Sequence, residues 1–166
     1  MKKLARFFLM GCTILVLTAC GGFNESEQSE KLLNRPFESN IAVKWCDKDY
    51  RGFIKKSNDG ILTVTLNSET LTEPLIFYYG DGGYGIEQGD LSFTAPKDTL
   101  PPGSLLSSLE QAFVMLPHAD ASTDGENLII KAGTAVLRCH KSDGTFIDLT
   151  LDRGIISFSD FVFSNN

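Results

Sequence analysis

The strongest constraint on the fold is a period-two alternation of apolar and polar side chains that ends repeatedly at turn signals. Residues 147–151 read Ile-Asp-Leu-Thr-Leu, and residues 61–66 show a similar alternation with β-branched side chains. A strand directs successive side chains to opposite faces, so this alternation indicates strands with one buried face. The pairs Asp59-Gly60 and Asp143-Gly144 can adopt the positive φ angles that tight hairpins require.

Short alternating or apolar runs recur along most of the chain. They cover residues 41–46, 50–56, 61–66, 75–79, 91–94, 127–131, 134–140, 145–151 and 155–163. About eight short antiparallel strands at this spacing favour a mainly β fold, either a small sandwich or a barrel. The polar stretch 119–126 is rich in Gly, Asp, Ser and Thr and is expected to be a loop.

One amphipathic helix is predicted at residues ~104–116. Its apolar side chains recur at steps of three and four, and Pro117 is expected to end it. Ser107 with Glu110 matches a capping box, and Ser104 is an alternative N-cap. The helix is expected to pack on the sheet or to close one end of it.

The N-terminus has the pattern of an export signal. A basic start containing Lys2, Lys3 and Arg6 precedes a mostly apolar stretch from residue 7 to 19. This stretch is shorter than the about 20 apolar residues that a bilayer span needs. A basic start, a short apolar segment and small residues at its end together predict a signal peptide over residues 1–19.

The end of this segment reads Leu17-Thr18-Ala19-Cys20, followed by Gly21. It resembles the lipobox of bacterial lipoproteins. The resemblance implies that diacylglycerol is attached to the Cys20 thiol, that the chain is cut before Cys20, and that acyl chains such as palmitate hold the protein on a membrane. In enterobacterial lipoproteins an Asp after the cysteine favours the inner membrane, so Gly21 implies an outer-membrane lipoprotein, expected to face the periplasm.

The exported chain is expected to have a tether and one domain. Residues 20–36 are polar and acidic at their start and predict a lipidated, flexible tether. Residues 37–166 predict a single β-rich domain. The signal segment holds three of the 15 basic residues and none of the 21 acidic ones, so the exported chain has a net charge of −9. This charge argues against a nucleic-acid partner, because phosphate binding needs Lys and Arg clusters.

Two cysteines remain in the exported domain, Cys46 and Cys139. An even number of cysteines in an exported chain predicts a disulfide, with two reduced thiols as the alternative. The two histidines, His118 and His140, do not have the spacing of a zinc site with these cysteines. We therefore expect no metal and no cofactor.

The segment from Tyr78 to Gly85 combines four glycines with three tyrosines. Glycines let a backbone approach a partner closely, and tyrosines are enriched at interfaces. Tyr78, Tyr79, Asp81 and Tyr84 therefore form a candidate recognition loop. The alternative is a hairpin whose tyrosines cover the edge of the core.

No catalytic motif is present: the sequence lacks a nucleophile elbow and a phosphate-binding loop. We therefore expect a non-enzymatic binding or accessory domain with a protein partner in the envelope. An envelope structural or assembly factor is the main alternative.

A further alternative rests on Val43-Lys44-Trp45-Cys46-Asp47, which resembles the opening strand of the membrane-bound inhibitors of c-type lysozyme. That resemblance implies a β-barrel and a cationic enzyme as partner. The inhibitors carry a Ser-Gly-x-x-Tyr loop, whereas the nearest segment here is Asp81-Gly82-Gly83-Tyr84. A toxin-immunity lipoprotein is a comparable alternative.

Overall fold

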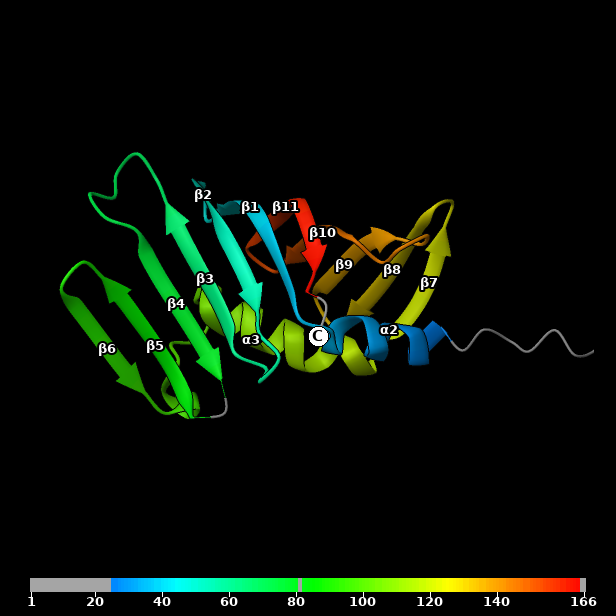
Figure 1. Ribbon diagram of the computed structural model, residues 1–166, viewed down its shortest axis with the longest axis horizontal. Coiled ribbons are helices and arrows are strands. Elements are labelled where there is room, and N and C mark those ends of the chain that lie inside the picture. The colour runs from blue at the N-terminus through cyan, green and yellow to red at the C-terminus, as the bar shows by residue number, and fades with distance from the viewer. Residues whose placement is uncertain (1–24, 81, 165–166) are drawn as a thin grey trace, which may run out of the picture.

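The computed structural model describes residues 25–80 and 82–164, and these form one antiparallel sheet of eleven strands with helices on one face (Figure 1). The strand order is β6-β5-β4-β3-β2-β1-β11-β10-β9-β8-β7. The strands are β1 (Phe37–Trp45), β2 (Lys48–Lys56), β3 (Leu62–Asn67), β4 (Leu75–Gly80), β5 (Gly83–Gln88), β6 (Leu91–Ala95), β7 (Asp120–Asp124), β8 (Asn127–Ala132), β9 (Ala135–His140), β10 (Phe146–Leu151) and β11 (Gly154–Phe163).

This order follows from successive hairpins. Strands β1 to β6 extend the sheet in one direction, and strands β7 to β11 build it back toward the centre, where β11 pairs with β1. The first and last strands of the chain are therefore neighbours, and β6 and β7 are the two free edges at opposite ends of the sheet (Figure 1).

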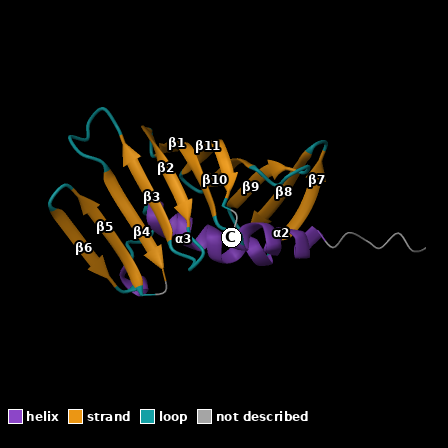
Figure 2. Cartoon of the chain, viewed as in Figure 1, coloured by secondary structure: helices purple, strands orange, loops and turns teal. Residues whose placement is uncertain are grey.

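The helices gather on one face of this sheet (Figure 2). They are α2 (Glu25–Asn34), the short 3₁₀ helix η1 (Lys97–Thr99), α3 (Leu105–Met115) and the short 3₁₀ helix η2 (Leu116–His118). We call the face that they cover the inner face and the opposite one the outer face. Among the described residues, no helix is long and apolar enough to span a bilayer.

The predicted helix is confirmed at α3. Of the two candidate N-caps the structure uses Ser104, whose hydroxyl accepts a hydrogen bond from the Ser107 amide at 3.1 Å. Leu105, Leu109 and Ala112 are buried against the sheet, as the apolar stripe requires. Pro117 follows the last turn of α3 and lies in η2.

The core lies between the inner face and the two helices. Its centre is aromatic: the Phe37 ring lies 6.0 Å from Phe113 of α3, 5.1 Å from Phe146 and 5.2 Å from Phe161. Val64, Leu137 and Ile156 of other strands are also fully or almost fully buried. This burial holds α3 across the middle strands.

The predicted tether is wrong from residue 25 onward, because residues 25–34 form α2. Leu33 is 0% exposed and Leu32 is 8% exposed. The Lys56 amine donates a hydrogen bond to the Leu33 carbonyl at 2.6 Å, close to the end of the helix. Burial lowers the pKa of Lys56. Two leucines in a polar segment are thus enough to dock this helix on the core, and residues 20–24 of the predicted tether lie outside the described residues.

The mainly β prediction is confirmed, whereas the eight-stranded sandwich or barrel is wrong. The expected loop at 119–126 contains β7, and the glycine-rich segment after Gly80 contains β5. The sheet stays open because β6 and β7 do not pair with each other. An open sheet also departs from the barrel that the likeness to lysozyme inhibitors implies.

Candidate functional site

Three rows of side chains cross the inner face from the covered strands to the β6 edge. Pairing between β3, β4, β5 and β6 aligns Val64, Phe77, Ile86 and Phe93 in one row. The exposed fraction rises along this row from 0% at Val64 to 56% at Phe93. The helices therefore stop covering the inner face before the sheet ends.

The neighbouring row behaves in the same way. It aligns Leu66, Leu75, Gln88 and Leu91, and exposure rises from 2% at Leu66 to 75% at Leu91. The apolar side chains at the uncovered end of both rows make one surface, which we call the open apolar face: Leu75, Phe77, Ile86, Leu91 and Phe93. This surface is continuous with the core, because its rows begin at buried core residues.

The third row contains Tyr79 and Tyr84 and borders one end of the open apolar face. The Tyr79 hydroxyl donates a hydrogen bond to Glu110 Oε1 of α3 at 2.9 Å, and Lys97 Nζ lies 5.0 Å from the centre of the Tyr79 ring. Burial raises the pKa of Tyr79, and the hydrogen bond to Glu110 adds to this shift. The Tyr84 hydroxyl donates to the Thr99 carbonyl at 3.5 Å. The segment between β6 and α3 therefore contacts both tyrosines and holds this end of the β4–β5 hairpin in place.

These contacts show what the predicted recognition loop is in the structure. Tyr79 and Tyr84 lie on the inner face, and Tyr84 is only 5% exposed. Tyr78 lies on the outer face with its ring over Gly85, where an added Cβ would come 2.0 Å from the ring. The segment is therefore a hairpin with tyrosines at the edge of the core, and Asp81 lies outside the described residues.

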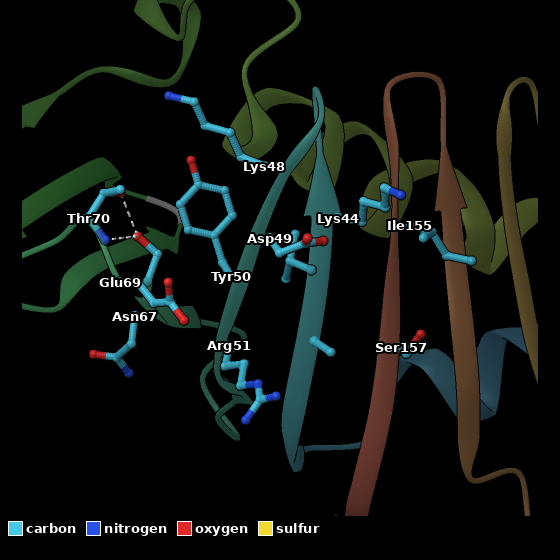
Figure 3. A pocket seen from close by; sticks show the side chains of 13 residues that line it. Lys44, Lys48, Asp49, Tyr50, Arg51, Asn67, Glu69, Thr70, Ile155 and Ser157 are labelled. Carbon is cyan, nitrogen blue, oxygen red and sulfur yellow. Dashed lines mark hydrogen bonds between the residues drawn. The ribbon is translucent and has the colours of Figure 1, made fainter.

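A second feature is a hollow of about 1150 Å³ between the outer face and the β3–β4 loop (Figure 3). Ala42 and Ser157 form part of its lining, and charged side chains of both signs surround them. The charged residues that line it are Lys44, Lys48, Asp49, Arg51 and Glu69. The hollow is open, and its lining combines these charged side chains with apolar ones such as Val43 and Ile155 and contains no His or Cys.

The predicted disulfide is wrong, since Cys46 and Cys139 are both free. Cys46 and Asp47 have φ angles of 47° and 64° and form the two-residue turn between β1 and β2. Cys139 is 0% exposed on β9, three strand positions away from β1. Three strand spacings amount to about 14 Å, whereas a disulfide needs Cα atoms closer than about 7 Å.

The remaining candidate groups do not converge on a centre. His118 and His140 are both exposed, at the end of η2 and of β9. Within the described residues, no cluster of three or more His, Cys, Asp or Glu side chains could hold a metal ion. Cys20, the predicted acylation site, lies outside the described part of the chain.

The open apolar face could not be predicted from the sequence, although the strands at 75–79 and 91–94 were. Leu91 and Phe93 alternate with Ser92 and Thr94, which is the signal of a strand with one apolar face. The sequence does not show that the helices leave this face uncovered. That fact depends on where α3 starts relative to β6.

The chain thus has the architecture of proteins built on one open antiparallel sheet with helices on its inner face. No family model matches the chain, and no curated protein matches its sequence. LprF from Mycobacterium bovis has a similar solved structure, with 11% identity over 85% of this chain and 94% of LprF, at a TM-score of 0.39. A LolA superfamily protein from Nitrosomonas europaea is 8% identical over 86% of this chain and 93% of its own, at a TM-score of 0.43. Similarity at this level supports no conclusion about function.

Proposed function

We propose that the protein is a non-enzymatic envelope lipoprotein that binds an apolar ligand, the acyl chains of a lipid, on the open apolar face. The observation that carries this proposal is the exposure of Leu91 (75%) and Phe93 (56%) on the same face as the buried core. Exposed apolar surface that adjoins a core marks interaction and ligand sites. An acyl chain suits this surface because the five side chains are all hydrocarbon.

The geometry favours an elongated ligand. One continuous row of apolar side chains, Phe77, Ile86 and Phe93, runs from β4 to the β6 edge, and Leu75 and Leu91 lie beside it on either side of Gln88. The Tyr79–Glu110 contact lies in the third row, at one end of this surface. An extended chain laid along the continuous row would contact Phe77, Ile86 and Phe93 in turn. Covering Leu91 and Phe93 alone is worth about 3 kcal/mol, from about 1.5–3 kcal/mol for each fully buried side chain.

A lipid anchor at Cys20 would bring this surface near a source of acyl chains. We propose that Cys20 is lipidated and holds the protein on the outer membrane, facing the periplasm. Helix α2 begins at Glu25, five residues after Cys20, and five extended residues reach at most about 18 Å. The folded domain would therefore stay close to the bilayer. Replacing Cys20 with Ser should move the protein from the membrane fraction to the soluble fraction, and unchanged fractionation would contradict the anchor.

A fluorescence titration tests ligand binding. The full exported chain carrying Cys20→Ser is titrated with cis-parinaric acid, a fluorescent fatty acid. The double variant Leu91→Ser/Phe93→Ser should weaken binding by at least tenfold, because about 1.4 kcal/mol corresponds to a factor of ten. Val162 is the matched control, since it is an exposed apolar side chain (55%) on the outer face of β11.

Val162→Ser should leave the dissociation constant unchanged. Two results would contradict the proposal: no saturable binding by the unmodified surface, or equal weakening by Val162→Ser and by the double variant.

A further inference from the structure

The two free edges of the sheet differ in how they are protected. Strand β7 has Asp120 and Asp124 at its ends, and α2 packs against it. Strand β6 reads Leu-Ser-Phe-Thr-Ala, has no charged residue, and is exposed at four of its five positions. Charges and covering elements are the usual means of keeping an edge strand from pairing with another chain. Edge β7 has both, and edge β6 has neither.

We propose that two copies of this chain pair β6 to β6 in antiparallel register, about a two-fold axis at Phe93. This register places Phe93 opposite the second copy's Phe93, Leu91 opposite its Ala95, and Ser92 opposite its Thr94. Apolar side chains meet on the inner face, and hydroxyl side chains meet on the outer face. The strand is thus complementary to itself, as a two-fold interface requires.

The residues that flank β6 fit the same register. Asp90 precedes the strand and Lys97 follows it. Antiparallel pairing brings the acidic end of one copy beside the basic end of the other, which favours this register over a parallel one. The Lys97 amine also lies over the Tyr79 ring, so it stays near this corner of the sheet.

The contact is small but sufficient for a reversible dimer. Pairing satisfies the backbone groups of those alternate β6 residues that do not bond β5, and it covers part of Leu91 and Phe93 in each copy. A contact through one five-residue strand belongs with the small, transient interfaces, which bury less than about 1,200 Å² in total. Anchoring through Cys20 would confine the copies to one membrane, which raises their effective concentration.

The dimer would join the two inner faces. The open apolar face of each copy would adjoin that of the other across Phe93, which doubles the width of the apolar surface. The pairing itself depends on backbone and side-chain complementarity, and so it does not require the proposed ligand.

Charge substitution on the outer face tests the register without touching the open apolar face. Ser92 and Thr94 are exposed and point away from the inner face. In Ser92→Lys/Thr94→Lys each lysine would lie opposite a lysine of the second copy, and like charges directly opposite one another are destabilising. The full lipidated chain is purified in detergent, and the mass of its protein component is measured by light scattering.

The unmodified chain should dimerise, with a dissociation constant in the micromolar range. The Lys variant and the matching Ser92→Glu/Thr94→Glu variant should each be monomeric, and a mixture of the two should form a heterodimer. Ser122→Lys on β7 is the control and should leave the dimer intact, because Ser122 lies on the opposite edge. The proposal is overturned if the unmodified chain is monomeric, or if both charge variants still dimerise alone.

This outcome can be separated from that of ligand binding. The Lys variant keeps Leu91 and Phe93, so it should still bind cis-parinaric acid if the proposed function holds. A monomeric unmodified chain that binds the fatty acid would overturn the dimer alone.

Discussion

At the scale of single residues, burial decides how the two cysteines behave. Cys139 is 0% exposed, and its thiol donates a hydrogen bond to the Leu128 carbonyl at 3.6 Å. Burial raises the pKa of Cys139 to about 12, and the nearby Asp143 carboxylate adds to the shift. Cys46 is exposed in its turn. The thiolate is the reactive form, so the two thiols should differ strongly in reactivity.

A thiol titration tests this difference. In the chain that starts at residue 20 and carries Cys20→Ser, and so lacks Cys12, Ellman's reagent at pH 8 should modify one thiol quickly, and Cys46→Ser should abolish that reaction. Cys139 stays protonated well above pH 8 in the folded state and should react only after unfolding in denaturant. No free thiol in the unreduced, unfolded chain would show that the predicted disulfide exists.

Gly52 illustrates a single-residue constraint on the sheet. A Cβ added at Gly52 would lie 1.8 Å from the Thr65 carbonyl oxygen, a backbone atom that cannot rotate away. Gly52→Ala should therefore lower the free energy of unfolding by more than about 2 kcal/mol, measured by urea denaturation. Gly82→Ala is the control, because nothing lies within 4 Å of its added Cβ. Equal stability of the two variants would contradict the close approach of β2 and β3.

At the scale of elements, α2 decides where the folded unit begins. Leu32 lies against Gly144 in the β9–β10 turn: a Cβ added there would come 2.2 Å from Leu32 Cδ1. Leu33 is fully buried, and its carbonyl accepts the Lys56 hydrogen bond. Helix α2 is therefore part of the core, and it begins five residues after Cys20, the proposed anchor.

Removing the Leu33 side chain tests this role. Leu33→Ala should lower the free energy of unfolding by about 2–5 kcal/mol, since it removes buried methyl groups and leaves a cavity. The exposed Glu30 in the same helix provides the control, and Glu30→Ala should change stability by less than about 0.5 kcal/mol. A change for Leu33→Ala as small as the control would mean that residues 25–34 are a tether after all.

The elements that the sequence predicts are those whose burial is periodic. Helix α3 and strands such as β3 and β9 have an apolar face at a fixed period, so local pattern and tertiary contact agree. Helix α2 was missed because only Leu32 and Leu33 are apolar near its end, and their burial depends on distant strands. Strand β7 was missed because an exposed edge strand needs no apolar face.

The direction of the tyrosine side chains could not be predicted for a different reason. Tyr78, Tyr79 and Tyr84 looked like a recognition loop because composition does not show side-chain direction. The register of β4 and β5 places two of them toward α3 and its preceding segment, where they are half-buried or buried. For Leu91 and Phe93 the sequence predicts only a short strand at 91–94, and the position of the helices shows that both side chains are exposed.

At the scale of the whole molecule, the inner face is only partly covered. Helices α2 and α3 cover the middle strands and the side toward β7, and β6 lies beyond the end of α3 (Figure 2). The result is one sheet with two regions: a covered part that supplies stability and an uncovered part that exposes the open apolar face. Without residues 1–19, the predicted signal peptide, the chain has a net charge of −9, and a net charge far from zero opposes self-association of such a surface.

Ligand binding should stabilise the whole fold, because the open apolar face is continuous with the core. A ligand that binds only the folded state raises stability by about 2.7 kcal/mol at a concentration 100 times its dissociation constant. Saturating palmitate should therefore raise the melting temperature of the Cys20→Ser chain measurably. The Leu91→Ser/Phe93→Ser variant should show a much smaller rise, and an equal rise would place the fatty acid elsewhere.

The most direct test of the central claim is to map where an acyl chain touches the protein. A palmitic acid analogue with a photoreactive diazirine is bound to the Cys20→Ser chain, irradiated, and located by tandem mass spectrometry. Trypsin releases residues 57–97 as one peptide, because no Lys or Arg lies between Lys56 and Lys97. We predict that this peptide carries the label, within β4, β5 and β6, and that unlabelled palmitate prevents it. Competable labelling confined to peptides outside β4–β6 would contradict the assignment of the open apolar face as the binding site.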